Sequence, residues 1–93
     1  MSIKSANAIW NEIKEQSGQM NASLSSTPHL LETNVLLTQS LNSVFSGQEP
    51  DVETLKRASE QLPNSIPSLS GDTQTYFAKL YRICDLIIQD SAN

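Results

Sequence analysis

The stretch that decides the fold lies near the end of the chain and reads TQTYFAKLYRICDLIIQ, from Thr73 to Gln89. At about 100° per residue, its apolar side chains cover a band roughly half of a helix circumference wide. A band this wide predicts a helix that packs against several others, or one that keeps a strip free for a partner. We expect the centre of the band to lie in the core, at Leu80, Ile83, Cys84 and Ile87.

The edges of this band are open to two interpretations. Tyr81 and Ile88 lie on one edge and Leu86 lies on the other. All three fit either the flanks of a crowded core or the beginning of a binding surface, because exposed apolar side chains that gather together mark partner sites.

The segment before the band, residues 63–71 (PNSIPSLSG), is rich in proline, serine and glycine. This composition predicts a long irregular connection without a regular element. Its apolar residues, Ile66 and Leu69, either hold the loop on the core or remain available to a partner, since loops usually run over the surface. We therefore expect the functional end of the protein to be this loop together with the last helix.

Three further helices are predicted upstream, because apolar residues recur there with helical spacing and no strand-like alternation competes. The chain length of 93 residues favours a single domain. Helices joined by short connections favour an all-α, antiparallel four-helix bundle. The predicted helices cover residues 3–22, 28–46, 50–62 and 72–89.

The first predicted helix carries a seam of residues spaced three and four apart, within which we expect Trp10 to be buried. Gly18 weakens its second half, because glycine costs about 1 kcal/mol relative to alanine in a helix. The seam residues are Ile3, Ala6, Trp10, Ile13, Ser17, Met20 and Leu24.

Local signals mark where the middle helices begin and end. Pro28 suits a first helical position, after Thr27 as a cap, and Gly47 is a natural stop. Glu49 or Asp51 caps the next helix, where an acidic side chain complements the helix dipole.

Composition limits the possible partners and compartments. The formal net charge is −4, which disfavours nucleic acid because phosphate binding depends on lysine and arginine. No apolar run approaches the ~20 residues of a membrane span, and the N-terminus lacks the pattern of a signal peptide. A single cysteine fits a reducing compartment, so we expect a cytoplasmic protein without a transmembrane segment.

The sequence carries no motif for catalysis, for a cofactor or for a metal. The lone histidine, His29, has no companion at ligand spacing, and we expect it at the surface. Cys84 has apolar and acidic neighbours that disfavour a thiolate, so we expect a buried, inert thiol. The glycines are far apart and form no phosphate loop. We therefore predict a binding protein that is not an enzyme.

Two segments in the second half, SVFSGQEPDVETLKRASEQL (residues 43–62) and YFAKLYRICDLI (residues 76–87), resemble the immunity proteins of pediocin-like bacteriocins. The resemblance covers residues 28–88 as pattern and spacing: a leucine-rich helix closing on glycine, a Pro-Asp turn and a final helix with Leu-Tyr. The negative net charge is a departure, since members of that family tend to be basic.

This resemblance implies a small intracellular antiparallel four-helix bundle that protects a producing cell from its own antimicrobial peptide. The partner would be a complex of bacteriocin and membrane receptor. Specificity in that family is associated with the last helices and the loop between them. The resemblance therefore implicates Ile66, Leu69, Tyr76, Tyr81 and Arg82 in partner binding, and the edges of the apolar band add Leu86 and Ile88.

A second hypothesis is an adaptor, a secretion-type chaperone or a small subunit of a larger helical assembly. It is motivated by the surplus of apolar residues on the second and fourth predicted helices. The identity of the partner and the oligomeric state are open in both hypotheses.

Overall fold

The computed structural model describes residues 2–92, and the side chains of residues 4–91. Every regular element within residues 2–92 is helical, so the prediction of an all-α protein is confirmed. The elements are α1 (Ser2–Ile13), α2 (Gln16–Ser23), α3 (Pro28–Phe45), α4 (Val52–Ser59), α5 (Leu62–Ser65), a 3-10 turn η1 (Ile66–Ser68) and α6 (Gly71–Ala92).

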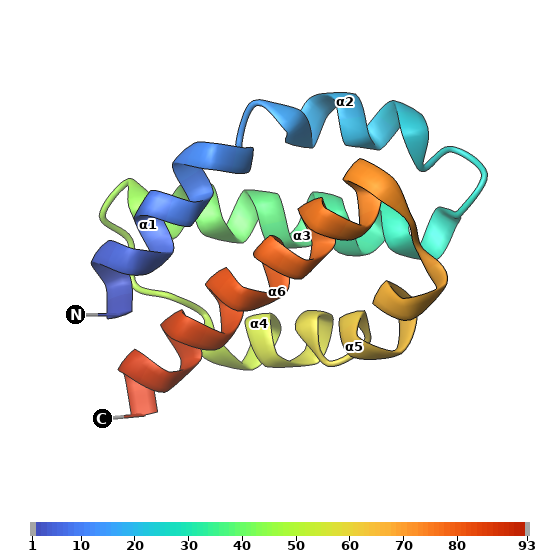
Figure 1. The fold of residues 1–93 in the computed structure, drawn as a ribbon. Helices are drawn as coiled ribbons and strands as arrows, with labels where there is room; N and C mark the ends of the chain where they lie inside the picture. Colours follow the sequence, from blue (N-terminus) through green and yellow to red (C-terminus); the bar gives the residue numbers. More distant parts are fainter. Residues whose placement is uncertain (1, 93) are drawn as a thin grey trace.

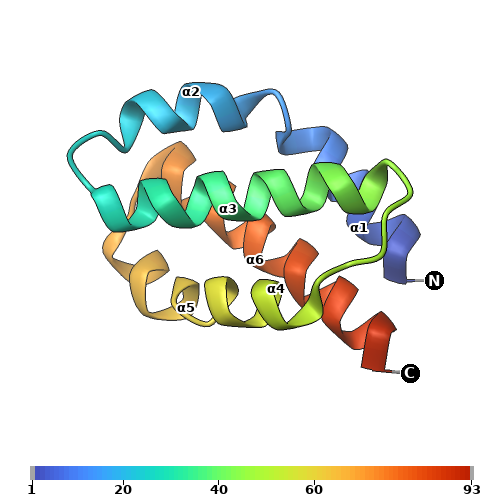
Figure 2. The same cartoon turned by 180° about the vertical axis from the view of Figure 1, so that it is seen from behind.

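Helix α6 crosses one face of the molecule, in front of α3 in Figure 1 and behind it in the reverse view of Figure 2. It packs most extensively on α1, and also on α4, α5 and η1. Helix α2 lies along α3, which in turn packs on α4. The chain runs back and forth along the long axis, so that both termini lie at the same end (Figures 1 and 2).

The core is built around α6. Leu80, Ile83 and Cys84 are fully buried and Ile87 is 1% exposed, as predicted. Trp10 is buried as well, and its ring stacks on that of Phe45 with 6.3 Å between centroids. The apolar residues that complete the core are Ala6, Ile13, Met20, Leu24, Leu30, Leu37, Leu41, Leu55, Ala58, Leu62, Tyr76, Phe77 and Leu86.

The prediction of one helix over residues 3–22 is wrong, because the chain breaks at Lys14 and Glu15. The Ser17 hydroxyl donates to the Lys14 carbonyl over 2.7 Å, a local bond that competes with the helical ladder. The apolar seam nevertheless continues through the break, since Met20 and Leu24 are buried. The side chain of Ile3, placed first in the seam, lies outside the described residues.

The predicted signals at α3 and α4 are largely confirmed. Pro28 starts α3, and Gly47 follows its end with φ +106°, a left-handed conformation that favours glycine. Thr27 precedes α3 without a side-chain cap bond. Asp51 caps α4 by accepting from the backbone N–H and the hydroxyl of Thr54, and these bonds lower the pKa of its carboxyl. Helix α4 ends at Ser59, before the predicted end at residue 62.

The prediction of an irregular loop over residues 63–71 is also wrong. Helix α5 and turn η1 occupy most of it. Pro63 and Pro67 lie in the first turn of α5 and of η1, where the missing N–H of proline has no helical partner to lose. The prolines therefore start short helical turns here and do not prevent them.

Candidate protein-binding groove on α6

The outward face of α6 forms the floor of a groove of about 580 Å³. The floor residues are one helical turn apart, so they share this face. Helix α1 forms one wall through Ile9 and Glu12, and Ile66 of η1 forms the other. The residues that α6 contributes are Gln74, Thr75, Ala78, Lys79 and Arg82.

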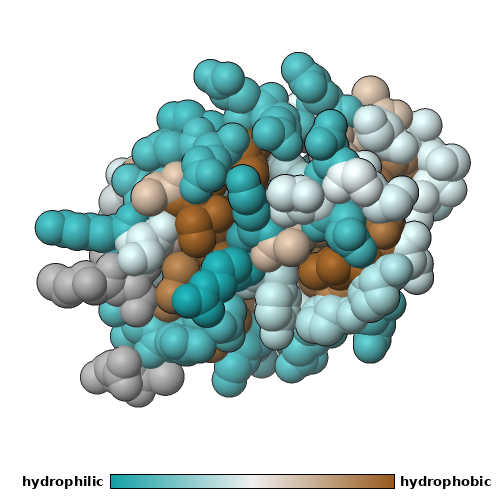
Figure 3. Space-filling view, in the orientation of Figure 1, coloured by the Kyte–Doolittle hydropathy of each residue, from teal (hydrophilic) through white to brown (hydrophobic). Residues whose placement is uncertain are grey.

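The groove is apolar at its centre. Ile9 and Ile66 are half-buried against the core, and the small side chain of Ala78 leaves the space between them unfilled. The Gln74 amide donates to the Ile66 carbonyl over 3.1 Å, which holds η1 against α6. Figure 3 shows hydrophobic surface over the α1–α6 junction and again beside α5, with hydrophilic side chains around both.

Charged side chains border this apolar centre. The Lys79 ammonium lies 3.3 Å from the Glu12 carboxylate, across α6 and α1. The Arg82 guanidinium lies 3.7 Å from the Asp85 carboxylate on the same helix. Exposed pairs of this kind contribute about 0–1 kcal/mol, so a partner's charges can replace them at little cost.

The structure brings together some of the residues predicted to bind a partner and separates others. Ile66 and Arg82 line the same groove. Tyr81 and Ile88 lie on a different face of α6, beside a hollow of about 180 Å³ shared with α4. Leu69 is half-buried and packs against the core, so it holds the η1–α6 connection in place.

Two of the predicted partner-binding residues are buried. Tyr76 is fully buried, its hydroxyl donates to Asn34 Oδ1 over 2.5 Å, and its ring lies edge-on to Phe77. Leu86 is only 8% exposed, so it is a flank of the core. Neither side chain can meet a partner in this conformation, because α6 directs both of them inward.

The groove also contains residues that the sequence did not single out, chiefly Ile9, Glu12, Ala78 and Lys79. Ile9 directly precedes Trp10 of the first seam. The available signal is the small Ala78 beside Lys79 and one turn before Arg82 on the outward face of the last helix. That signal is weak, because exposed alanines are common in helices.

A second exposed apolar feature lies on α3, where Val35 is 36% and Leu36 is 43% exposed. Leu36 borders a hollow of about 390 Å³ between α3 and α4, together with His29 and Arg57. His29 is exposed at the start of α3, as predicted. This face of α3 carries the surplus apolar residues predicted for the second helix. Most of the surplus apolar residues of the last helix lie in the core.

Cys84 is buried within α6. Burial raises the pKa of the Cys84 thiol to about 12, and the neighbouring Asp85 carboxylate adds to the rise, so the thiol stays protonated at neutral pH. Among the residues that the structure describes, no three His, Cys, Asp or Glu side chains are placed to hold a metal ion. No helix in this part of the chain has the length and hydrophobicity needed to cross a membrane.

Comparison with known proteins found no matching family model, no matching curated protein and no matching solved structure. The resemblance to bacteriocin immunity proteins therefore rests on the pattern and spacing of this chain alone. The geometry of the candidate site consists of an apolar centre, two exposed ion pairs at its border, a floor from α6 and walls from α1 and η1.

Proposed function

We propose that this protein acts by binding a protein partner through the groove on α6. The observation that carries the proposal is that Ile66 and Arg82, predicted as contacts on other grounds, line one groove around Ala78. An apolar centre with a polar, solvent-accessible rim is the usual anatomy of a protein interface. A volume of about 580 Å³ has room for an apolar anchor side chain of the partner and its neighbours.

The specific function that we propose is bacteriocin immunity. With α1 and α2 counted as one bent helix, and α4 and α5 as another, the fold that we propose is an antiparallel four-helix bundle of the kind that the resemblance implies. In this proposal the protein works in the cytoplasm of the producing cell, without catalysis and without a cofactor. Its partner is a complex of the bacteriocin and a membrane receptor, contacted through the groove.

The test of this function begins with the genes beside this one. A short peptide gene with a double-glycine leader is expected there. Sensitive cells that express this protein should survive the peptide, whereas cells with an empty vector should die. Equal killing of both would contradict the immunity function.

A second candidate function is that of a small subunit, an adaptor or a chaperone in a larger helical assembly. The observation that favours it is the exposed pair Val35 and Leu36 on α3. Sedimentation velocity of the purified protein distinguishes the subunit function from the immunity function. An obligate subunit is expected to self-associate, and Leu36→Glu should abolish that association. A stable monomer at high concentration would count against the subunit.

A further inference from the structure

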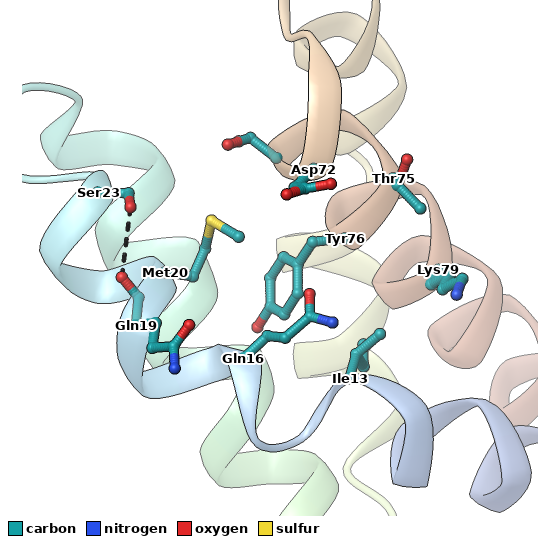
Figure 4. Close-up of a pocket in the computed structure, with 10 residues that line it drawn as sticks. Ile13, Gln16, Gln19, Met20, Ser23, Asp72, Thr75, Tyr76 and Lys79 are labelled. Carbon is teal, nitrogen blue, oxygen red and sulfur yellow. Dashed lines mark hydrogen bonds between the residues drawn. The ribbon is translucent and has the colours of Figure 1, made fainter.

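Helix α2 is held to the rest of the protein by few apolar contacts. Of its eight residues, Met20 is the buried one. It packs on α3. Between α2 and the start of α6 lies a solvent-open pocket of about 540 Å³, and Figure 4 shows the Tyr76 ring entering this space from α6 beside Met20 and Gln16.

A chain of hydrogen bonds joins α2 to the core. Asn34 of α3 is fully buried, and its Nδ2 donates to Asn21 Oδ1 over 2.7 Å and to the Ser17 carbonyl over 3.4 Å. Its Oδ1 accepts from the Tyr76 hydroxyl over 2.5 Å. One side-chain amide thus connects α2, α3 and α6. We call Asn21, Asn34 and Tyr76 the polar latch.

Both ends of α2 are suited to act as hinges. Turns flank it at Lys14–Glu15 and at residues 24–27. The elements beyond these turns are anchored, because Ile13 at the end of α1 and Leu30 at the start of α3 are almost completely buried. Within α2, Gly18 has no heavy atom near the position of an added Cβ, so nothing is packed over it.

We propose that α2 opens as a unit on these turns while α1, α3 and α6 stay folded, with the polar latch setting how often it opens. Opening exchanges the bonds from Asn34 to Asn21 and to the Ser17 carbonyl for bonds to water, and such an exchange costs far less than exposing a packed apolar face. The open state widens this pocket, which exposed side chains such as Gln16 and Gln19 already border, and makes the buried hydroxyl of Tyr76 accessible. This inference does not depend on what the α6 groove binds.

Native-state hydrogen exchange on the full chain tests the proposal. The amides of residues 16–23 should exchange with an opening free energy well below that of the amides in the middle of α6. Their exchange should also be insensitive to low concentrations of denaturant, because local opening exposes little surface. Exchange of both groups with one free energy and one denaturant dependence would overturn the proposal.

The latch is tested by Asn21→Ala, which removes the α2 side of the hydrogen-bonded chain. Exchange in α2 should become about tenfold faster, the loss of roughly one net hydrogen bond, with little change in α6. Gln19→Ala is the matched control, on an exposed position of the same helix. Alanine has the higher helix propensity in both variants, so propensity cannot produce the acceleration. Equal exchange in the two variants would show that Asn21 is not a latch.

Discussion

At the scale of residues, the most informative position is Asn34. It is fully buried, yet it lies on the apolar seam of α3 between Leu30 and Leu37. A lone asparagine on such a seam sets the register of neighbouring helices, because only one arrangement satisfies its amide. This signal is present in the sequence. The pairing with Tyr76 cannot be predicted from the sequence, because the two residues are 42 positions apart and Tyr76 looks like one more aromatic residue in an apolar band.

Replacing the tyrosine tests this pair. Tyr76→Phe leaves Asn34 Oδ1 buried without the donor that satisfies it, which should lower the free energy of unfolding by about 1–3 kcal/mol. Urea denaturation followed by circular dichroism measures the change. Tyr81→Phe is the control, because Tyr81 is half-buried on the outer side of the same helix and should change stability by less. Equal effects would mean that the Asn34 bond contributes nothing.

Cys84 makes the free energy of unfolding depend on pH in the alkaline range. Its folded pKa of about 12 exceeds its ordinary value of 9.0 because the thiol is buried. Its contribution is therefore fully present below about pH 9 and is lost as the pH rises toward 12, since the unfolded chain ionises first. The pKa of Tyr76 is raised for the same reason, so it acts in the same direction.

Denaturation at a series of pH values checks this prediction. The free energy of unfolding should fall steadily above pH 9, and Cys84→Ala should make the fall shallower, whatever its effect at neutral pH. A thiol reagent at pH 8 should label Cys84 only as fast as the protein unfolds. Rapid labelling of the folded protein would contradict the burial of the thiol.

At the scale of elements, the sequence predicts helices better than it predicts their interruptions. The apolar spacing locates α3 and α6 well, because both are long, and α3 also has strong end signals at Pro28 and Gly47. It misses the break at residues 14–15, since the apolar seam runs on through it. It also misses α5 and η1, because prolines usually mark irregular segments and here occupy first turns.

Alanine substitutions at Gly18 and Gly47 make a matched pair of variants. Gly18 lies inside α2, and an added Cβ would meet nothing, so Gly18→Ala should stabilise the protein by about 0.5–1 kcal/mol. Gly47 has equally open space, but its φ of +106° strains any other residue. Gly47→Ala should therefore destabilise the protein in the same urea titration. Variants that shift stability in the same direction would contradict this distinction between space and backbone conformation.

At the scale of the whole molecule, α6 has two roles. Its inner side, including Leu80 and Ile83, forms the centre of the core. Its outer side forms the floor of the groove between Ile9 and Ile66. The sequence predicts that the last helix and the segment before it belong together. It does not predict the wall from α1, because a contact between the two ends of the chain depends on how the helices pack.

The most direct test of the central claim places a large charged side chain in the groove. Ala78→Glu fills its centre from an exposed position of α6 and leaves the core intact, and Ala22→Glu makes the same change on an exposed position of α2 outside it. Survival of sensitive cells exposed to the bacteriocin encoded beside this gene should be retained with the wild type and with Ala22→Glu, and lost with Ala78→Glu at equal expression. Full protection by Ala78→Glu would contradict the assignment of the α6 groove as the binding surface.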